Sequence, residues 1–161
     1  MKKLDALNQV KEFHKTFDVP VLKNPEIPSK ERCELRISLI QEELNELKEA
    51  IENNDMVEVA DALCDLQYVL SGTVLEFGLG KKFPKLFDEV QRSNMSKACK
   101  SQKEALSTLS SYKKKDGTEG HYKEINGKFI VYRKDDNKVL KSINYSPADL
   151  KKIVENESQK V

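Results

Sequence analysis

Carboxylates are crowded between residues 41 and 65, where apolar spacing predicts two consecutive helices. At about 100° per residue, Glu43 and Glu46 fall inside the arc covered by the leucines and isoleucines of the first helix, and Glu42 lies at its edge. The other glutamates of this helix fall on its polar side: Glu34, Glu49 and Glu52. One group of acids is therefore expected to face inwards, where a carboxylate needs a positive partner.

The second helix carries its acids in a narrow stripe. Glu58, Asp61 and Asp65 lie at i, i+3 and i+7, within about 60° of one another, and the remaining faces are largely apolar. Ion pairs across the helices are one way to neutralise these acids, but Arg36 is the only basic residue expected on the inner side of the first helix. A hard divalent cation is the other way, and a donor set made only of oxygen selects Mg²⁺ or Mn²⁺. The shortage of inward-facing bases favours the metal.

The composition excludes several classes of function. Lys and Arg number 28 against 27 for Asp and Glu, so the net charge of +1 gives no bulk attraction to nucleic acid or to an anionic membrane. No signal peptide is apparent, and no segment approaches the roughly 18 uninterrupted apolar residues of a membrane span. The three cysteines form no CxxC pair, which argues against a disulfide framework and a thiolate zinc site. A cytoplasmic protein is expected.

Four helical segments must position the acids. Apolar spacing predicts a first helix over residues 4–17, which three following prolines end. A second helix is expected from the N-cap Ser29 to about Asn53, and a third from Asp55 to about Phe77, where glycines follow. The third is apolar on most of its circumference, so we expect it at the centre of a bundle. A mostly helical fourth segment is expected up to residue 115.

The pattern changes after Gly117. Strand-forming residues with turn signals at Asn126-Gly127 and Asp136-Asn137 predict a three-stranded antiparallel meander, followed by a short final helix. We therefore expect a mainly α protein, with a four-helix-type bundle over residues 1–115 and a β-meander plus helix over residues 116–161. The aromatic residues and lysines of the strands are interpreted as an ordinary sheet packed on the bundle rather than as a nucleic-acid platform.

Read as motifs, the acids form EExxE at residues 42–46 and ExxD at residues 58–61. This pair resembles the signature of the all-α nucleotide pyrophosphohydrolases, which include MazG-like enzymes, the phosphoribosyl-ATP pyrophosphohydrolases and the dimeric dUTPases. The segment EVQRSNMSK, residues 89–97, is similar to the part of that superfamily that supplies substrate-binding Asn and Lys. The resemblance spans roughly residues 5 to 100, so the meander and the final helix lie outside it.

The resemblance implies hydrolysis of a nucleoside triphosphate between the α and β phosphates, with Mg²⁺ or Mn²⁺ as cofactor. By position in the motifs, the implied metal ligands are Glu43, Glu46, Glu58 and Asp61. Glu42 is then expected to orient or deprotonate the attacking water. Asp65 lies outside the motifs and is expected either to hold a second metal through water or to pair with a lysine.

Cations for the polyphosphate are expected between residues 92 and 100. Asn94, Lys97 and Lys100 follow at i, i+3 and i+6 and can face one ligand, with Arg92 reaching in from the side. A solvated face is the alternative for the lysines. His14 is interpreted as a packing residue rather than a contact of the base.

The leading hypothesis is a metal-dependent (d)NTP pyrophosphohydrolase that cleans the nucleotide pool. The alternatives are phosphoribosyl-ATP hydrolysis in histidine synthesis and a non-catalytic nucleotide or metal sensor. Because the third helix is apolar nearly all round, a homodimer or a pair of dimers is expected, as in this superfamily, with no nucleic-acid or membrane partner.

Overall fold

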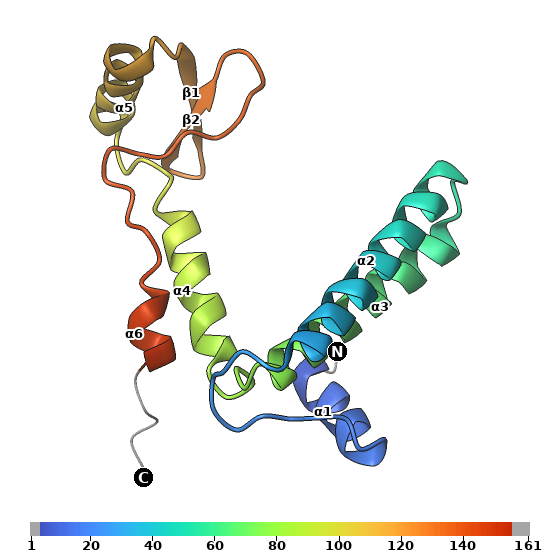
Figure 1. Cartoon of the computed structure of the whole chain (residues 1–161). Coiled ribbons are helices and arrows are strands. Elements are labelled where there is room, and N and C mark those ends of the chain that lie inside the picture. The colour runs from blue at the N-terminus through green and yellow to red at the C-terminus, as the bar shows by residue number, and fades with distance from the viewer. Residues whose placement is uncertain (1–3, 156–161) are drawn as a thin grey trace. The chain divides into compact units, whose positions relative to one another are not determined.

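The computed structural model describes residues 4–155, which contain six helices and one two-stranded sheet (Figure 1). The chain divides between Phe83 and Pro84 into two compact units. The sequence predicts a boundary between two domains after residue 115, and this boundary stays a prediction. The bounds of the helices and strands are α1 Ala6–Thr16, α2 Lys30–Glu52, α3 Met56–Glu76, α4 Phe83–Met95, α5 Gln102–Asp116, β1 Gly120–Ile125, β2 Lys128–Arg133 and α6 Leu150–Glu155.

The first three helices begin and end close to where their sequence signals predict. The Ser29 hydroxyl accepts a hydrogen bond from the backbone N–H of Arg32 and caps α2, which ends at Glu52 with Asn53 as its C-cap. The Asp55 carboxylate caps α3 in the same way by accepting from the N–H of Val57 at 2.9 Å. Local capping therefore explains where each of the two acidic helices begins.

In the first unit α2 and α3 pack side by side as an antiparallel hairpin, and α1 packs on α3 (Figure 1). The four-helix-type bundle is not confirmed, because this unit has three helices among its described residues. α3 is the helix of this unit on which both α1 and α2 pack, but they do not enclose it. Leu63 is 52% exposed and Leu70 is 45% exposed, since α1 and α2 cover only part of the circumference of α3.

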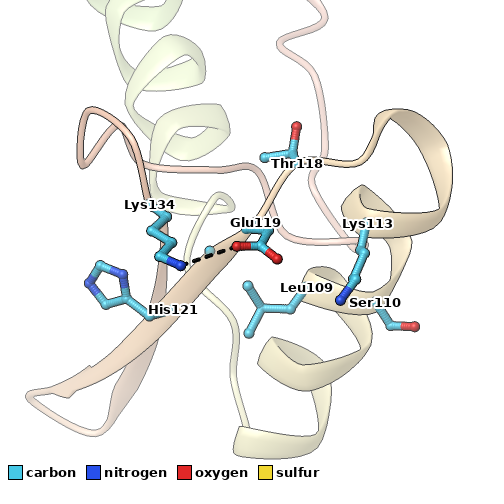
Figure 2. Close-up of a pocket in the computed structure, with 8 residues that line it drawn as sticks. Leu109, Ser110, Lys113, Thr118, Glu119, His121 and Lys134 are labelled. Atoms are coloured by element: carbon cyan, nitrogen blue, oxygen red, sulfur yellow. Dashed lines mark hydrogen bonds and ion pairs between the residues drawn. The ribbon is translucent and has the colours of Figure 1, made fainter.

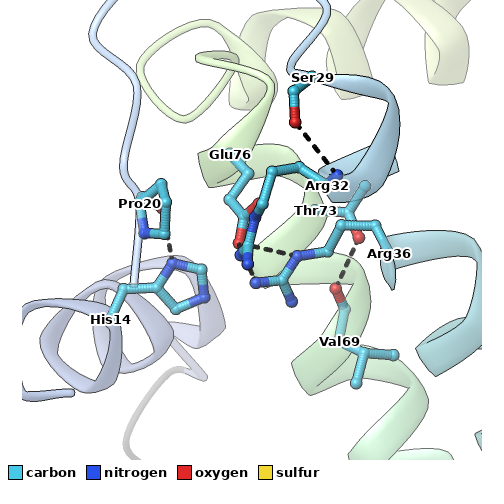
Figure 3. Close-up of polar contacts among 8 residues, drawn as sticks. All are labelled: His14, Pro20, Ser29, Arg32, Arg36, Val69, Thr73 and Glu76. Carbon is cyan, nitrogen blue, oxygen red and sulfur yellow. Dashed lines mark hydrogen bonds and ion pairs between the residues drawn. The ribbon is translucent and has the colours of Figure 1, made fainter. Parts of the chain in front are cut away.

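A buried ion cluster joins α2 to the end of α3 (Figure 3). The Glu76 side chain is 1% exposed and accepts hydrogen bonds from Nε of Arg32 at 3.0 Å and from Nε of Arg36 at 2.9 Å. His14 of α1 is buried near this cluster, and its Nδ1 donates to the Pro20 carbonyl oxygen at 2.9 Å (Figure 3). The interpretation of His14 as a packing residue agrees with this position.

The fourth segment is mostly helical, as expected, but it is not one continuous helix. It divides into α4 and α5 around residues 96–101, where the backbone of Cys99 donates to and accepts from Phe129 at 2.9 Å in each direction. A residue whose N–H and C=O bond a strand cannot also take part in the helical ladder. A new N-cap, Ser101, then starts α5.

The three-stranded meander is reduced to a hairpin. β1 and β2 pair through the turn at Asn126 and Gly127, both of which have positive φ, as the Asn-Gly signal predicts. The third segment makes only an isolated bridge between Val139 and Tyr132. α5 packs on the hairpin over a small core, which consists of Cys99, Ala105, Val131 and Leu140.

Candidate functional site

Acidic side chains surround a cavity of about 320 Å³ near the turn between α2 and α3. In an antiparallel hairpin, residues equally far from the turn lie level with each other, so the second half of EExxE meets ExxD. Three of the four implied metal ligands, Glu46, Glu58 and Asp61, line this one cavity. The complete lining is Glu46, Glu49, Ala50, Asn53, Asp55, Glu58, Asp61 and Ala62.

Glu43, the fourth implied ligand, is not part of that lining and has an unusual environment. Its Oε2 atom is buried without a hydrogen-bond partner. Burial raises the pKa of the Glu43 carboxyl, and the charges of Asp65, Glu46 and Glu42 raise it further. Asp65 is therefore close enough to repel Glu43, which extends the acidic region away from the turn.

The residues fit a hard divalent cation in their donor chemistry. The donors are carboxylates only, they repel one another, and one buried oxygen has no partner. Their side chains do not converge, however: within residues 4–155 no group of three or more acids, histidines or cysteines is arranged to hold a metal ion. The acids surround a space without forming a closed coordination shell.

Ion pairing is not what neutralises these acids. In the described part of the chain, no Lys or Arg forms a salt bridge with any acid of the two motifs or with Asp65. Arg36, the base expected to face inwards, is bonded to Glu76 instead. Among the described residues, no salt bridge therefore compensates the charge of the acidic region.

Two lining acids were not predicted from the sequence. Glu49 was placed on the polar side of its helix, yet it lines the cavity together with Glu46, which lies three residues earlier. This i, i+3 spacing was the available signal. Asp55 is the second, and its carboxylate is already used as the N-cap of α3.

The residues expected to bind the polyphosphate lie in the second unit, whereas the acids lie in the first. Arg92 donates to both carboxylate oxygens of Glu89, at 2.7 and 2.8 Å, and to the Pro147 carbonyl oxygen at 2.9 Å. Lys97 Nζ donates to the Asn94 side-chain oxygen at 2.8 Å, so these two side chains lie next to each other; that they face one ligand stays a prediction.

A different cavity, of about 540 Å³, lies between α5 and the start of β1 (Figure 2). Its single acid, Glu119, pairs with Lys134 at 3.2 Å. Lys113 and His121 also line it. Because this cavity has no group of carboxylates, it is a poorer candidate than the α2–α3 cavity for binding a divalent metal ion.

Comparison with known proteins identifies one family and one relative. The sequence profile of the phosphoribosyl-ATP pyrophosphohydrolase family matches residues 10–94, about half of the chain. The uncharacterized protein L479 of Acanthamoeba polyphaga mimivirus is 23% identical over an alignment of 215 positions, which covers 80% of this chain and 82% of that protein. This likeness extends beyond residue 94 into the second unit. Among the described helices, none is long and apolar enough to cross a membrane.

Proposed function

This chain belongs to the phosphoribosyl-ATP pyrophosphohydrolase family, and on that premise we propose that it is a metal-dependent (d)NTP pyrophosphohydrolase. The proposed reaction is attack of water on a nucleoside triphosphate between the α and β phosphates. The products are the nucleoside monophosphate and pyrophosphate. Clearing unwanted nucleotides from the pool is the proposed role.

The observation that carries this proposal is the acidic cavity within the segment matched by the family. Glu46, Glu58 and Asp61 line it, and Glu43 has a buried oxygen without a partner. We assign these four acids to binding Mg²⁺ or Mn²⁺, which when bound would neutralise charge on the phosphates. The carboxylate of Glu42 is exposed on α2 and is assigned to orienting or deprotonating the attacking water.

The proposal also includes a homodimer or a pair of dimers. Exposed apolar residues recur every seven positions on both helices of the hairpin, which keeps each set on one line along its helix. They are Ile37, Leu44 and Ile51 on α2 and Met56, Leu63 and Leu70 on α3, each between 45% and 76% exposed. The apolar lines on the helix pair of one chain can pack against the same lines on a second copy of the chain.

Phosphoribosyl-ATP is a second candidate substrate, favoured by the description of the family itself. It shares the α–β phosphoanhydride bond, so the same acids serve either reaction. A growth test separates the two candidate substrates: the chain is expressed, on medium without histidine, in a strain that lacks its own phosphoribosyl-ATP pyrophosphohydrolase. Complementation by this chain assigns the histidine role, and its absence together with (d)NTP turnover assigns the pool-cleaning role.

The test is pyrophosphate release from a panel of canonical and modified (d)NTPs with Mg²⁺ or Mn²⁺. We expect turnover that EDTA abolishes and that Glu46→Gln lowers by at least about 100-fold, because a carboxylate assigned to binding the metal is replaced by a neutral amide. Glu34→Gln is the matched control, since Glu34 lies on α2 but away from the cavity. Metal-dependent nucleotide binding without turnover would instead favour a sensor.

A further inference from the structure

The segment of residues 141–149, called the strap below, lies along α4 within the second unit (Figure 1). Hydrogen bonds hold it over much of its length. They run from Ser142 N to Lys97 O at 3.1 Å, from Ser146 N to Ser96 Oγ at 3.0 Å, from Arg92 Nη2 to Pro147 O at 2.9 Å, and from Asp149 N to Glu89 Oε1 at 2.8 Å. The strap is therefore bound to the segment that carries Asn94 and Lys97.

Two strap residues bring polar groups to that segment. The Ser93 hydroxyl donates to the Tyr145 hydroxyl at 3.0 Å, and Lys141 Nζ lies 4.4 Å from the centroid of the Tyr145 ring. The hydrogen bond from Ser93 lowers the pKa of Tyr145, and the nearby charges of Lys141, Lys97 and Arg92 lower it further. Three cations are thus gathered around one phenol.

Among the described residues, a carboxylate neutralises only one of these cations. Arg92 forms a two-oxygen pair with Glu89. Within residues 4–155, Lys97 contacts the neutral amide of Asn94, Lys141 contacts an aromatic ring, and neither forms a salt bridge. Because Ser93 donates to Tyr145, the proton of the Tyr145 hydroxyl is left for another acceptor. Two ammonium groups, an amide and a phenol make a set of donors suited to phosphate oxygens.

We propose that Lys141 and Tyr145, together with Asn94 and Lys97, form a site within the second unit that binds the phosphate groups of the nucleotide. This inference rests on the proposed function and adds to it a role for the strap, which lies outside the segment matched by the family. It also gives Arg92 a different role from the expected one. Arg92 is a positioning residue, whose guanidinium holds the strap against α4 through Pro147 while Glu89 neutralises it.

The test measures binding of inorganic tripolyphosphate to the full chain by isothermal titration calorimetry, beside the kinetics of pyrophosphate release. Lys141→Met is expected to weaken tripolyphosphate binding and raise KM about tenfold with kcat within about threefold, because a charge-assisted contact to phosphate is lost. Tyr145→Phe keeps the ring and removes the hydroxyl, and is expected to weaken binding about threefold. Lys141→Arg is expected to retain binding.

Lys138→Met is the matched control, because Lys138 lies three residues before Lys141 and only its backbone is hydrogen-bonded. Equal affinities for Lys141→Met and Lys138→Met, or a wild-type chain that binds no tripolyphosphate, would overturn the proposal. If the wild-type chain has no hydrolytic activity but Lys141→Met still loses tripolyphosphate binding, the proposed function is refuted and this inference stands. If Lys141→Met keeps the wild-type KM and normal turnover, this inference is refuted and the proposed function stands.

Discussion

Two glutamates of the first unit have opposite environments: Glu76, whose side chain is buried, and Glu43, of which one carboxylate oxygen is buried. Burial opposes ionisation of Glu76, but hydrogen bonds from Arg32 and Arg36 hold its pKa below the usual range. Glu43 has no such cation, and burial together with neighbouring acids raises its pKa. A carboxylate with two guanidinium partners stabilises the fold, whereas one with a raised pKa and an unpartnered oxygen indicates a place for a cation from solution.

Glu76→Gln tests the structural role. Removing the charge leaves two guanidinium groups without their anion, one of them buried, so we expect the free energy of unfolding to fall by about 3 kcal/mol. Urea denaturation followed by circular dichroism measures this loss. Glu34→Gln removes an exposed carboxylate that pairs with Lys30, and we expect a change below about 0.5 kcal/mol. Equal losses in both variants would contradict the assignment.

At the scale of the elements, the end of α3 depends on a glycine. Gly78 has φ +67°, and a Cβ at this position would lie 1.8 Å from the backbone oxygen of Asn24. Gly78→Ala is therefore expected to lower the free energy of unfolding by about 3 kcal/mol or more, from backbone strain and from the clash. Thermal and urea unfolding measure it.

Gly117→Ala is the control for that substitution. Gly117 has φ +77°, but nothing lies within 4 Å of the position of its Cβ. Only the strain of the left-handed conformation is then incurred, about 1 kcal/mol. If Gly78→Ala and Gly117→Ala lower the free energy of unfolding equally, the close approach of Asn24 to Gly78 does not contribute to the loss.

The attachment of the strap to α4 should depend on pH. Hydrogen bonds from Arg92 and from the N–H of Asp149 lower the pKa of Glu89 to about 2 in the folded protein. Because the folded pKa is below the unfolded one, this stabilisation is present above about pH 4.5 and is lost as the pH falls towards 2. We expect the difference in unfolding free energy between wild type and Glu89→Gln to shrink over this interval. A difference independent of pH would contradict the role of Glu89.

At the scale of the whole molecule, the apolar lines on α2 and α3 predict self-association. Leu63→Glu places a charge in the middle of the α3 line, and we expect it to convert an oligomer into a monomer, measured by size exclusion with light scattering. Leu106→Glu is the control, since Leu106 on α5 is exposed to the same degree but lies on neither line. A monomeric wild type at micromolar concentration would refute the homodimer.

The sequence by itself determined the bounds of α2 and α3, the turn between them and the acids that meet across it. These features depend on atoms two to seven residues apart: the caps at Ser29 and Asp55, and the helical spacing within EExxE and ExxD. The hairpin turn at Asn126-Gly127 is local in the same sense. Such local interactions can be predicted from a single sequence because both interacting residues lie within one short stretch of it.

Only the tertiary structure decided the features that join distant residues. Cys99 bonds Phe129 and interrupts the fourth helical segment, and Arg92 bonds Pro147, 55 residues away. The same holds for Arg36, which pairs with Glu76 rather than with the acids of the motifs. No helical or strand period encodes such contacts, because they depend on how the chain folds back on itself. For that reason the acids were predictable, and the strap beside Asn94 and Lys97 was not.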